Sequence, residues 1–164
     1  MGKAKQVSLC AVLTALALAL SLAERLIPMP LPGMKLGLAN IVTLVALSVL
    51  GTRQAAAILF CRCVLGAVFG GGITGLAFSL CGGFLALGTM ILAGHGRFSV
   101  FGISMLGAAA HNVGQILAAM ALMGSVYVGY YLSFLLLVAV GTGLLTGGLC
   151  AGVLGILRKT GGGL

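Results

Sequence analysis

The chain has 164 residues, of which 61% are hydrophobic and only 6% are charged. A soluble domain usually carries about 25% charged residues, because polar side chains must cover its surface. The composition therefore excludes a soluble globular protein and predicts one integral membrane domain, an all-α bundle, over residues 1–164. The 28 glycines follow no G-X-Y period, which excludes collagen.

The formal net charge of +8 comes from Lys and Arg residues spread one or two at a time between apolar runs. A nucleic-acid-binding protein gathers its basic residues on one face, so this pattern argues against a nucleic-acid partner. The five cysteines form no CxxC pair, and the chain holds one carboxylate and two histidines. Because these residues offer few groups that could bind a metal ion, we expect neither a metal nor a cofactor.

Six apolar stretches are separated by polar or glycine-rich breaks. The first follows Lys3 and Lys5; its apolar core is long for a signal peptide and leads into more membrane segments, so we predict a spanning helix. A break is predicted at Gly70-Gly71-Gly72. The predicted spans are residues 7–27, 36–50, 55–69, 73–93, 98–123 and 131–157.

Six spans place both termini on one side of the membrane. That side receives six basic residues, whereas the other receives two, which places the termini in the cytoplasm of a multi-pass cell-membrane protein. The six are Lys3, Lys5, Arg53, Arg97, Arg158 and Lys159, and the two are Arg25 and Lys35.

All three prolines lie in the first connection, at residues 28–35, and Gly33 follows them. Proline cannot donate to a helix and holds its neighbour in extended geometry, so this connection is predicted to be stiff and non-helical. By the charge count it lies outside the cell, where we expect it to cap a binding site.

Several polar side chains lie within the predicted spans. A charge at mid-bilayer costs several kcal/mol, so Arg62 must face the interior, a cavity or a partner. We predict one substrate pocket that opens to the outside. Its floor is Arg62, His111, Asn112 and Gln115, and its upper wall is Asn40, Lys35 and Glu24.

The alternative interpretation is that these groups only form hydrogen bonds between packed helices. Four hydroxyl residues are predicted to bond to their own helix backbones and receive no role. They are Ser21, Thr43, Ser79 and Thr89.

The chemistry of this pocket favours binding and does not favour an enzyme. No aspartate is present, so neither a Ser-His-Asp triad nor a carboxylate pair for magnesium can form, and no catalytic residue is predicted. Arg62 and Lys35 would attract an anionic small molecule.

Ala11, Ala15, Ala19 and Ala23 recur every fourth residue and share one face of the first predicted helix. Small residues at this spacing let helices approach closely. The face serves either packing within the chain or docking of a separate membrane subunit, for which Ala11, Ala15 and Ala19 are the candidates.

Three stretches, PGMKLGLANIVTLVAL (residues 32–47), RCVLGAVFGG (62–71) and AHNVGQ (110–115), resemble the family labelled both Gx transporter and heptaprenyl diphosphate synthase component I. The similarity runs from about residue 7 to residue 157. That family in turn is similar in architecture to the S components of energy-coupling-factor transporters. The similarity implies six helices, internal termini, a first loop that caps the substrate and an alanine-rich first helix that contacts a transmembrane coupling subunit.

The leading hypothesis is thus an S-component-like subunit that binds a small polar or anionic molecule for uptake. Because no nucleotide-binding P-loop is present, partner ATPases would supply the energy. A first alternative, from the family label, is a non-catalytic membrane component of heptaprenyl diphosphate synthase in isoprenoid or quinone metabolism. A second alternative is a membrane component of a flavin- or quinone-linked extracellular electron-transfer system.

Overall fold

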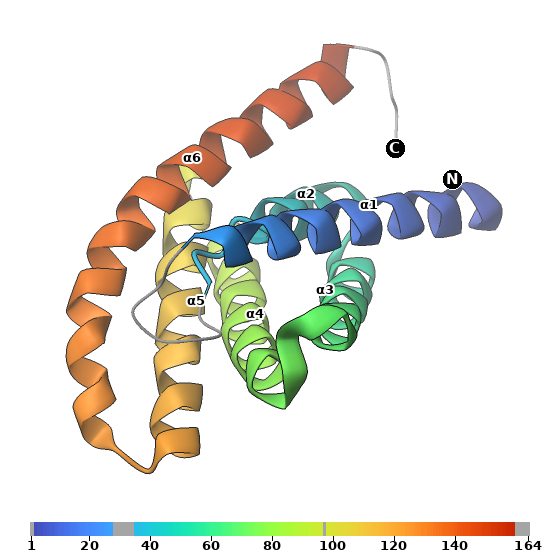
Figure 1. Ribbon diagram of the computed structural model, residues 1–164. Coiled ribbons are helices and arrows are strands. Elements are labelled where there is room, and N and C mark those ends of the chain that lie inside the picture. Colours follow the sequence, from blue (N-terminus) through green and yellow to red (C-terminus); the bar gives the residue numbers. More distant parts are fainter. Residues whose placement is uncertain (1, 28–34, 97, 160–164) are drawn as a thin grey trace.

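The structure, a computed structural model, describes residues 2–27, 35–96 and 98–159 (Figure 1). Within these ranges every regular element is helical. Three short elements join the longer helices: η1 (Glu24–Leu26) and η3 (Val126–Tyr130) are 3-10 helices, and η2 (Ala67–Gly71) is a π-helical turn. The α-helices are α1 (Lys3–Ala23), α2 (Asn40–Leu50), α3 (Thr52–Gly66), α4 (Gly72–Gly94), α5 (Val100–Met123) and α6 (Tyr131–Lys159).

Four stretches of helix are long and apolar enough to cross a membrane, which makes this a multi-pass membrane protein. With 11 residues, α2 measures about 16 Å and is shorter than the hydrocarbon core of a bilayer. The six predicted segments all contain helix, but α3 and α4 belong to one stretch of 43 residues. Six separate spans and cytoplasmic termini therefore stay predictions. The four stretches are Lys3–Leu26, Thr52–Gly94, Val100–Met123 and Val126–Lys159.

The predicted break between α3 and α4 is confirmed. Phe69 and Gly70 leave helical geometry, and Gly70 has a φ of +100°, which favours glycine. The guanidinium of Arg25 donates hydrogen bonds to the carbonyls of Gly66 and Phe69. These bonds satisfy carbonyl groups at the end of α3, so the end of α1 is anchored to the break.

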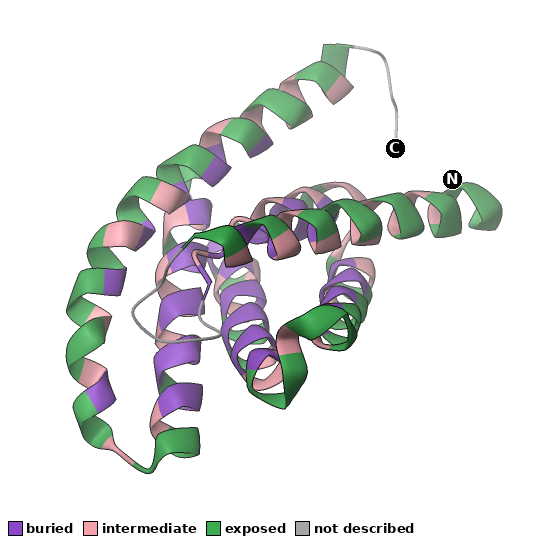
Figure 2. Cartoon of the chain, in the orientation of Figure 1, coloured by how far each residue is buried: buried purple, intermediate pink, exposed green. Residues whose placement is uncertain are grey.

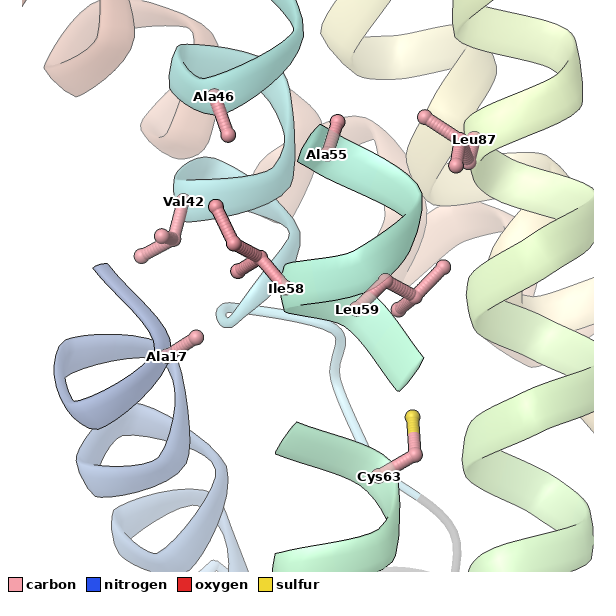
Figure 3. Close-up of a cluster of buried hydrophobic side chains, with 8 residues drawn as sticks. All are labelled: Ala17, Val42, Ala46, Ala55, Ile58, Leu59, Cys63 and Leu87. Atoms are coloured by element: carbon pink, nitrogen blue, oxygen red, sulfur yellow. The ribbon is translucent and has the colours of Figure 1, made fainter. Parts of the chain in front are cut away.

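Two larger apolar clusters stabilise the bundle. Figure 3 shows the first, where side chains of α1, α2, α3 and α4 converge. The second joins α4, α5, η3 and α6. The first comprises Ala17, Val42, Ala46, Ala55, Ile58, Leu59, Cys63 and Leu87, and the second comprises Phe78, Ile116, Ala118, Ala119, Val128 and Leu135.

The backbones of α4 and α5 meet at Gly114. A Cβ atom there would lie 2.6 Å from the carbonyl oxygen of Cys81 and 2.7 Å from the Cα of Gly82. Only a residue without a side chain allows this approach. The contact holds the polar residues of α5 against α4.

Gly114→Ala is expected to destabilise the protein by about 1–3 kcal/mol, because the new methyl group overlaps backbone atoms that cannot move aside. The measurement is the thermal unfolding midpoint in detergent. Gly88→Ala is the matched control on α4, since nothing lies within 4 Å of its Cβ position. Equal midpoints for the two variants would contradict this close helix contact.

Candidate binding site

The structure brings the seven residues predicted for binding into the protein interior. They come from η1, from the segment before α2, and from α2, α3 and α5. Figure 2 shows many buried residues along α4 and α5. Each side chain exposes 6% of its surface or less: Glu24, Lys35, Asn40, Arg62, His111, Asn112 and Gln115.

The side chain of Arg62, a residue of α3, reaches the beginning of α2. Its Nη2 atom donates a hydrogen bond of 3.2 Å to Oδ1 of Asn40, the first residue of that helix. Within the described ranges, Nε of Arg62 and Nδ2 of Asn40 are buried and have no hydrogen-bond partner. An unpaired buried donor costs about 1–3 kcal/mol, so these two groups call for an acceptor.

Gln115 holds the backbone of Lys35 at two points. The Lys35 N–H donates to Oε1 of Gln115 at 2.7 Å, and Nε2 of Gln115 donates to the Lys35 carbonyl oxygen at 2.7 Å. The side-chain amide thus satisfies both backbone groups of a residue that lies outside any helix. This pairing fixes the segment that leads into α2 against α5.

The Lys35 ammonium group also lies inside. Its Nζ donates to the hydroxyl of Ser21 on α1 at 2.8 Å and to that of Ser79 on α4 at 3.1 Å. Burial lowers the pKa of Lys35 to about 8, and the nearby Arg62 guanidinium acts in the same direction. We expected Ser21 and Ser79 to bond only to their own helices; instead, they accept hydrogen bonds from this lysine.

Glu24 contacts the backbone that precedes α2. Its Oε1 atom accepts a hydrogen bond from the N–H of Leu38, and its charge interacts with those of Arg62 and Lys35. In the part of the chain that the structure describes, Oε2 of Glu24 has no partner. One oxygen of the carboxylate is therefore held and the other is not.

The His111 ring lies between α4 and the segment of the chain that precedes α2. A Cβ on Gly37, which has a φ of +85°, would lie 2.9 Å from Cδ2 of His111 and 3.0 Å from Nδ2 of Asn40. A Cβ on Gly82 would lie 2.8 Å from Nδ1 of His111. Among the residues described, neither ring nitrogen finds a hydrogen-bond partner.

The two amide residues of α5 have partners within the protein. Nδ2 of Asn112 donates to the Leu135 carbonyl of α6 at 2.7 Å. Such a bond between helices is what the packing interpretation predicts for Asn112. Substrate contact stays a prediction for all seven residues. Among the described residues, Arg62, Asn40 and His111 have buried polar atoms without a partner.

Thr43 also belongs to this region, although we expected it only to bond to its own helix. It is 1% exposed, and its Oγ1 has no partner within residues 2–27, 35–96 and 98–159. The sequence feature that points to Thr43 is its spacing, because a residue three positions after Asn40 lies on the same face of α2. The expected bond of Thr89 to its own helix is confirmed, with Leu85 as the acceptor at 2.8 Å.

The predicted capping loop, residues 28–35, lies outside the described residues except for Lys35. The predicted docking face lies within them. Ala11, Ala15 and Ala19 are exposed, while α1 buries Ala17 and Ser21 on its other side (Figure 2). The described residues therefore leave the alanine face largely uncovered.

The cluster has a positive formal charge, because Lys35 and Arg62 face the single carboxylate of Glu24. Guanidinium and amide donors form their strongest hydrogen bonds with anions. Over the residues searched, no group of three or more His, Cys, Asp or Glu residues lies close enough to hold a metal ion. The arrangement suits binding of an oxyanion.

Comparison with known proteins identifies a family. The family model Heptaprenyl diphosphate synthase component I matches residues 13–153, a range that includes the whole polar cluster. Neither a search of curated proteins nor a search of solved structures found a match. Because the family model covers most of the sequence, the chain belongs to the heptaprenyl diphosphate synthase component I family.

Proposed function

We propose that this protein is a membrane-embedded subunit that binds a small polar or anionic molecule for uptake, in the manner of an S component. The observation that carries the proposal is the pair of unpartnered buried donors within the described chain, Nε of Arg62 and Nδ2 of Asn40. They lie next to each other, because the same two side chains share a hydrogen bond.

A bound anion would offset the free energy lost by burying the unpaired donors of Arg62 and Asn40. Each unsatisfied donor costs about 1–3 kcal/mol, and a charge held in a membrane interior costs several more. A carboxylate or phosphate oxygen would accept from both donors and would balance the excess positive charge of Lys35 and Arg62. Packing alone would be served better by apolar side chains of similar volume.

The exposed face of α1 supports docking of a transmembrane coupling subunit. Small residues such as Ala11, Ala15 and Ala19 allow close helix contact, and the described part of the chain leaves them exposed. Since no P-loop is found in the sequence, partner ATPases would provide the energy for uptake.

Arg62→Gln is expected to lower the amount of small molecule that stays bound after gentle purification at least about tenfold, because it removes the charge and the guanidinium donors, Nε among them. Arg53→Gln, at an exposed position in the same helix, is the matched control and is expected to retain the molecule. The measurement is mass spectrometry of the released ligand, normalised to folded protein by size-exclusion chromatography.

Arg62→Lys tests the binding geometry, because it keeps the charge and removes the planar guanidinium group. We expect it to retain less ligand than the native protein and more than Arg62→Gln. Equal ligand retention by the native protein and Arg62→Gln would refute the proposed site.

A second candidate function is that of a non-catalytic membrane component of heptaprenyl diphosphate synthase. The family assignment over residues 13–153 favours it. The chain has no aspartate, so the carboxylates that hold magnesium for prenyl transfer would come from a partner synthase component. In this case the diphosphate of a prenyl chain would face the cationic cluster, and its tail would lie among apolar helices.

This second candidate predicts that a soluble, aspartate-rich prenyl diphosphate synthase co-purifies with the protein and gains activity from it. It also predicts that farnesyl diphosphate raises the unfolding midpoint more than inorganic diphosphate does, because only the former buries an apolar tail. Equal effects of the two compounds, with no synthase recovered, would exclude this function.

A further inference from the structure

We infer that the carboxylate of Glu24 occupies the place of the ligand's oxyanion at the N-terminus of α2, and that the ligand binds by displacing it. This inference rests on the proposed function and deepens it. The anionic group of the ligand would bind at the N-terminus of α2, and Glu24 would compete with the ligand for that place.

The N-terminus of α2 is a suitable place for an anion. Helix N-termini carry unpaired N–H groups and a partial positive charge, and they bind carboxylates and phosphates. Here the N–H groups of Asn40, Ile41 and Val42 already donate to the carbonyls of residues 37–39, and the N–H of Leu38, two residues before α2, donates to Oε1 of Glu24. A carboxylate therefore already lies where an anion would bind.

Two buried side chains at the same place lack an acceptor. Arg62 and Asn40 are 3% and 4% exposed, and they meet at the first residue of α2. As far as the chain is described, Nε of Arg62 and Nδ2 of Asn40 remain unpartnered. Glu24 thus satisfies the Leu38 N–H and leaves these donors unused. An oxyanion with several acceptor atoms would pair with more of the available donors than Glu24 does.

The exchange of one anion for another keeps the charge of the cluster constant. Glu24 is the only acidic residue in the sequence, so no other carboxylate can take its place. It lies in η1, two residues before the exposed Leu26. Its second oxygen has no partner in the described structure, so the carboxylate is held at one atom only.

Glu24→Gln is the test, because the amide can still accept from Leu38 and no longer competes as an anion. The binding curves are taken from unfolding midpoints of the full chain in detergent, read with a thiol-reactive dye. The probes are acetate and inorganic phosphate, with chloride at equal ionic strength as the blank. Removing an internal competitor raises the fraction of binding-competent protein, so we expect half-saturation at about one tenth of the native concentration.

Thr52→Lys is the matched control, since it adds the same unit of charge at an exposed site. It is expected to leave the half-saturating concentration unchanged. Glu24→Asp keeps the charge but shortens the side chain by one methylene group, which weakens its hold on the Leu38 N–H, so binding should also tighten. If the Glu24 variants bind only acetate more tightly, the site takes a carboxylate. If they bind only phosphate more tightly, it takes a phosphate.

Equal or weaker binding by both Glu24 variants, with native binding that still depends on Arg62, would overturn the inference and leave the proposed function intact. If neither the native protein nor the variants bind either anion in an Arg62-dependent way, both proposals fail.

Discussion

The site depends on the burial of Arg62 among apolar helices. A guanidinium group removed from water needs hydrogen-bond acceptors and opposite charge around it. Asn40 is the acceptor and Glu24 provides the opposite charge, and each residue belongs to a different element of the fold. Asn40 begins α2, and Glu24 ends the helical run of α1. The first two helices are therefore positioned around one cation of the third.

The segment from Lys35 to Ala39 is the second organising feature of the site. The carbonyls of residues 37–39 accept from the first N–H groups of α2, and side chains of other elements satisfy further backbone groups of the segment. Gln115 and Glu24 do so, and Ser21 and Ser79 receive the ammonium group of Lys35. The polar residues of the helices thus serve two purposes. Some hold this segment, while Arg62, Asn40 and His111 keep buried polar atoms that have no partner in the described structure.

Much of this arrangement could be predicted from the sequence, because polar residues are conspicuous in apolar helices. The cost of exposing Arg62 and His111 to lipid is enough to predict that both face the interior. The bond between Gln115 and Lys35 could not be predicted in this way, since it joins residues 80 positions apart. Thr43 was missed because a lone hydroxyl in a helix usually bonds to its own backbone. The length of α2 also differs from expectation, because the segment before it serves the site instead of extending the helix.

One consequence follows from the adjacency of Glu24 and Arg25. The first residue reaches the entry of α2, and the second holds the carbonyls at the break between α3 and α4. Both lie in η1, a single tight turn at the end of the helix that bears the alanine face. The turn therefore ties two consecutive residues to two different parts of the bundle, the entry of α2 and the break between α3 and α4. The exposed alanine face of α1 is thus held at a fixed position relative to both.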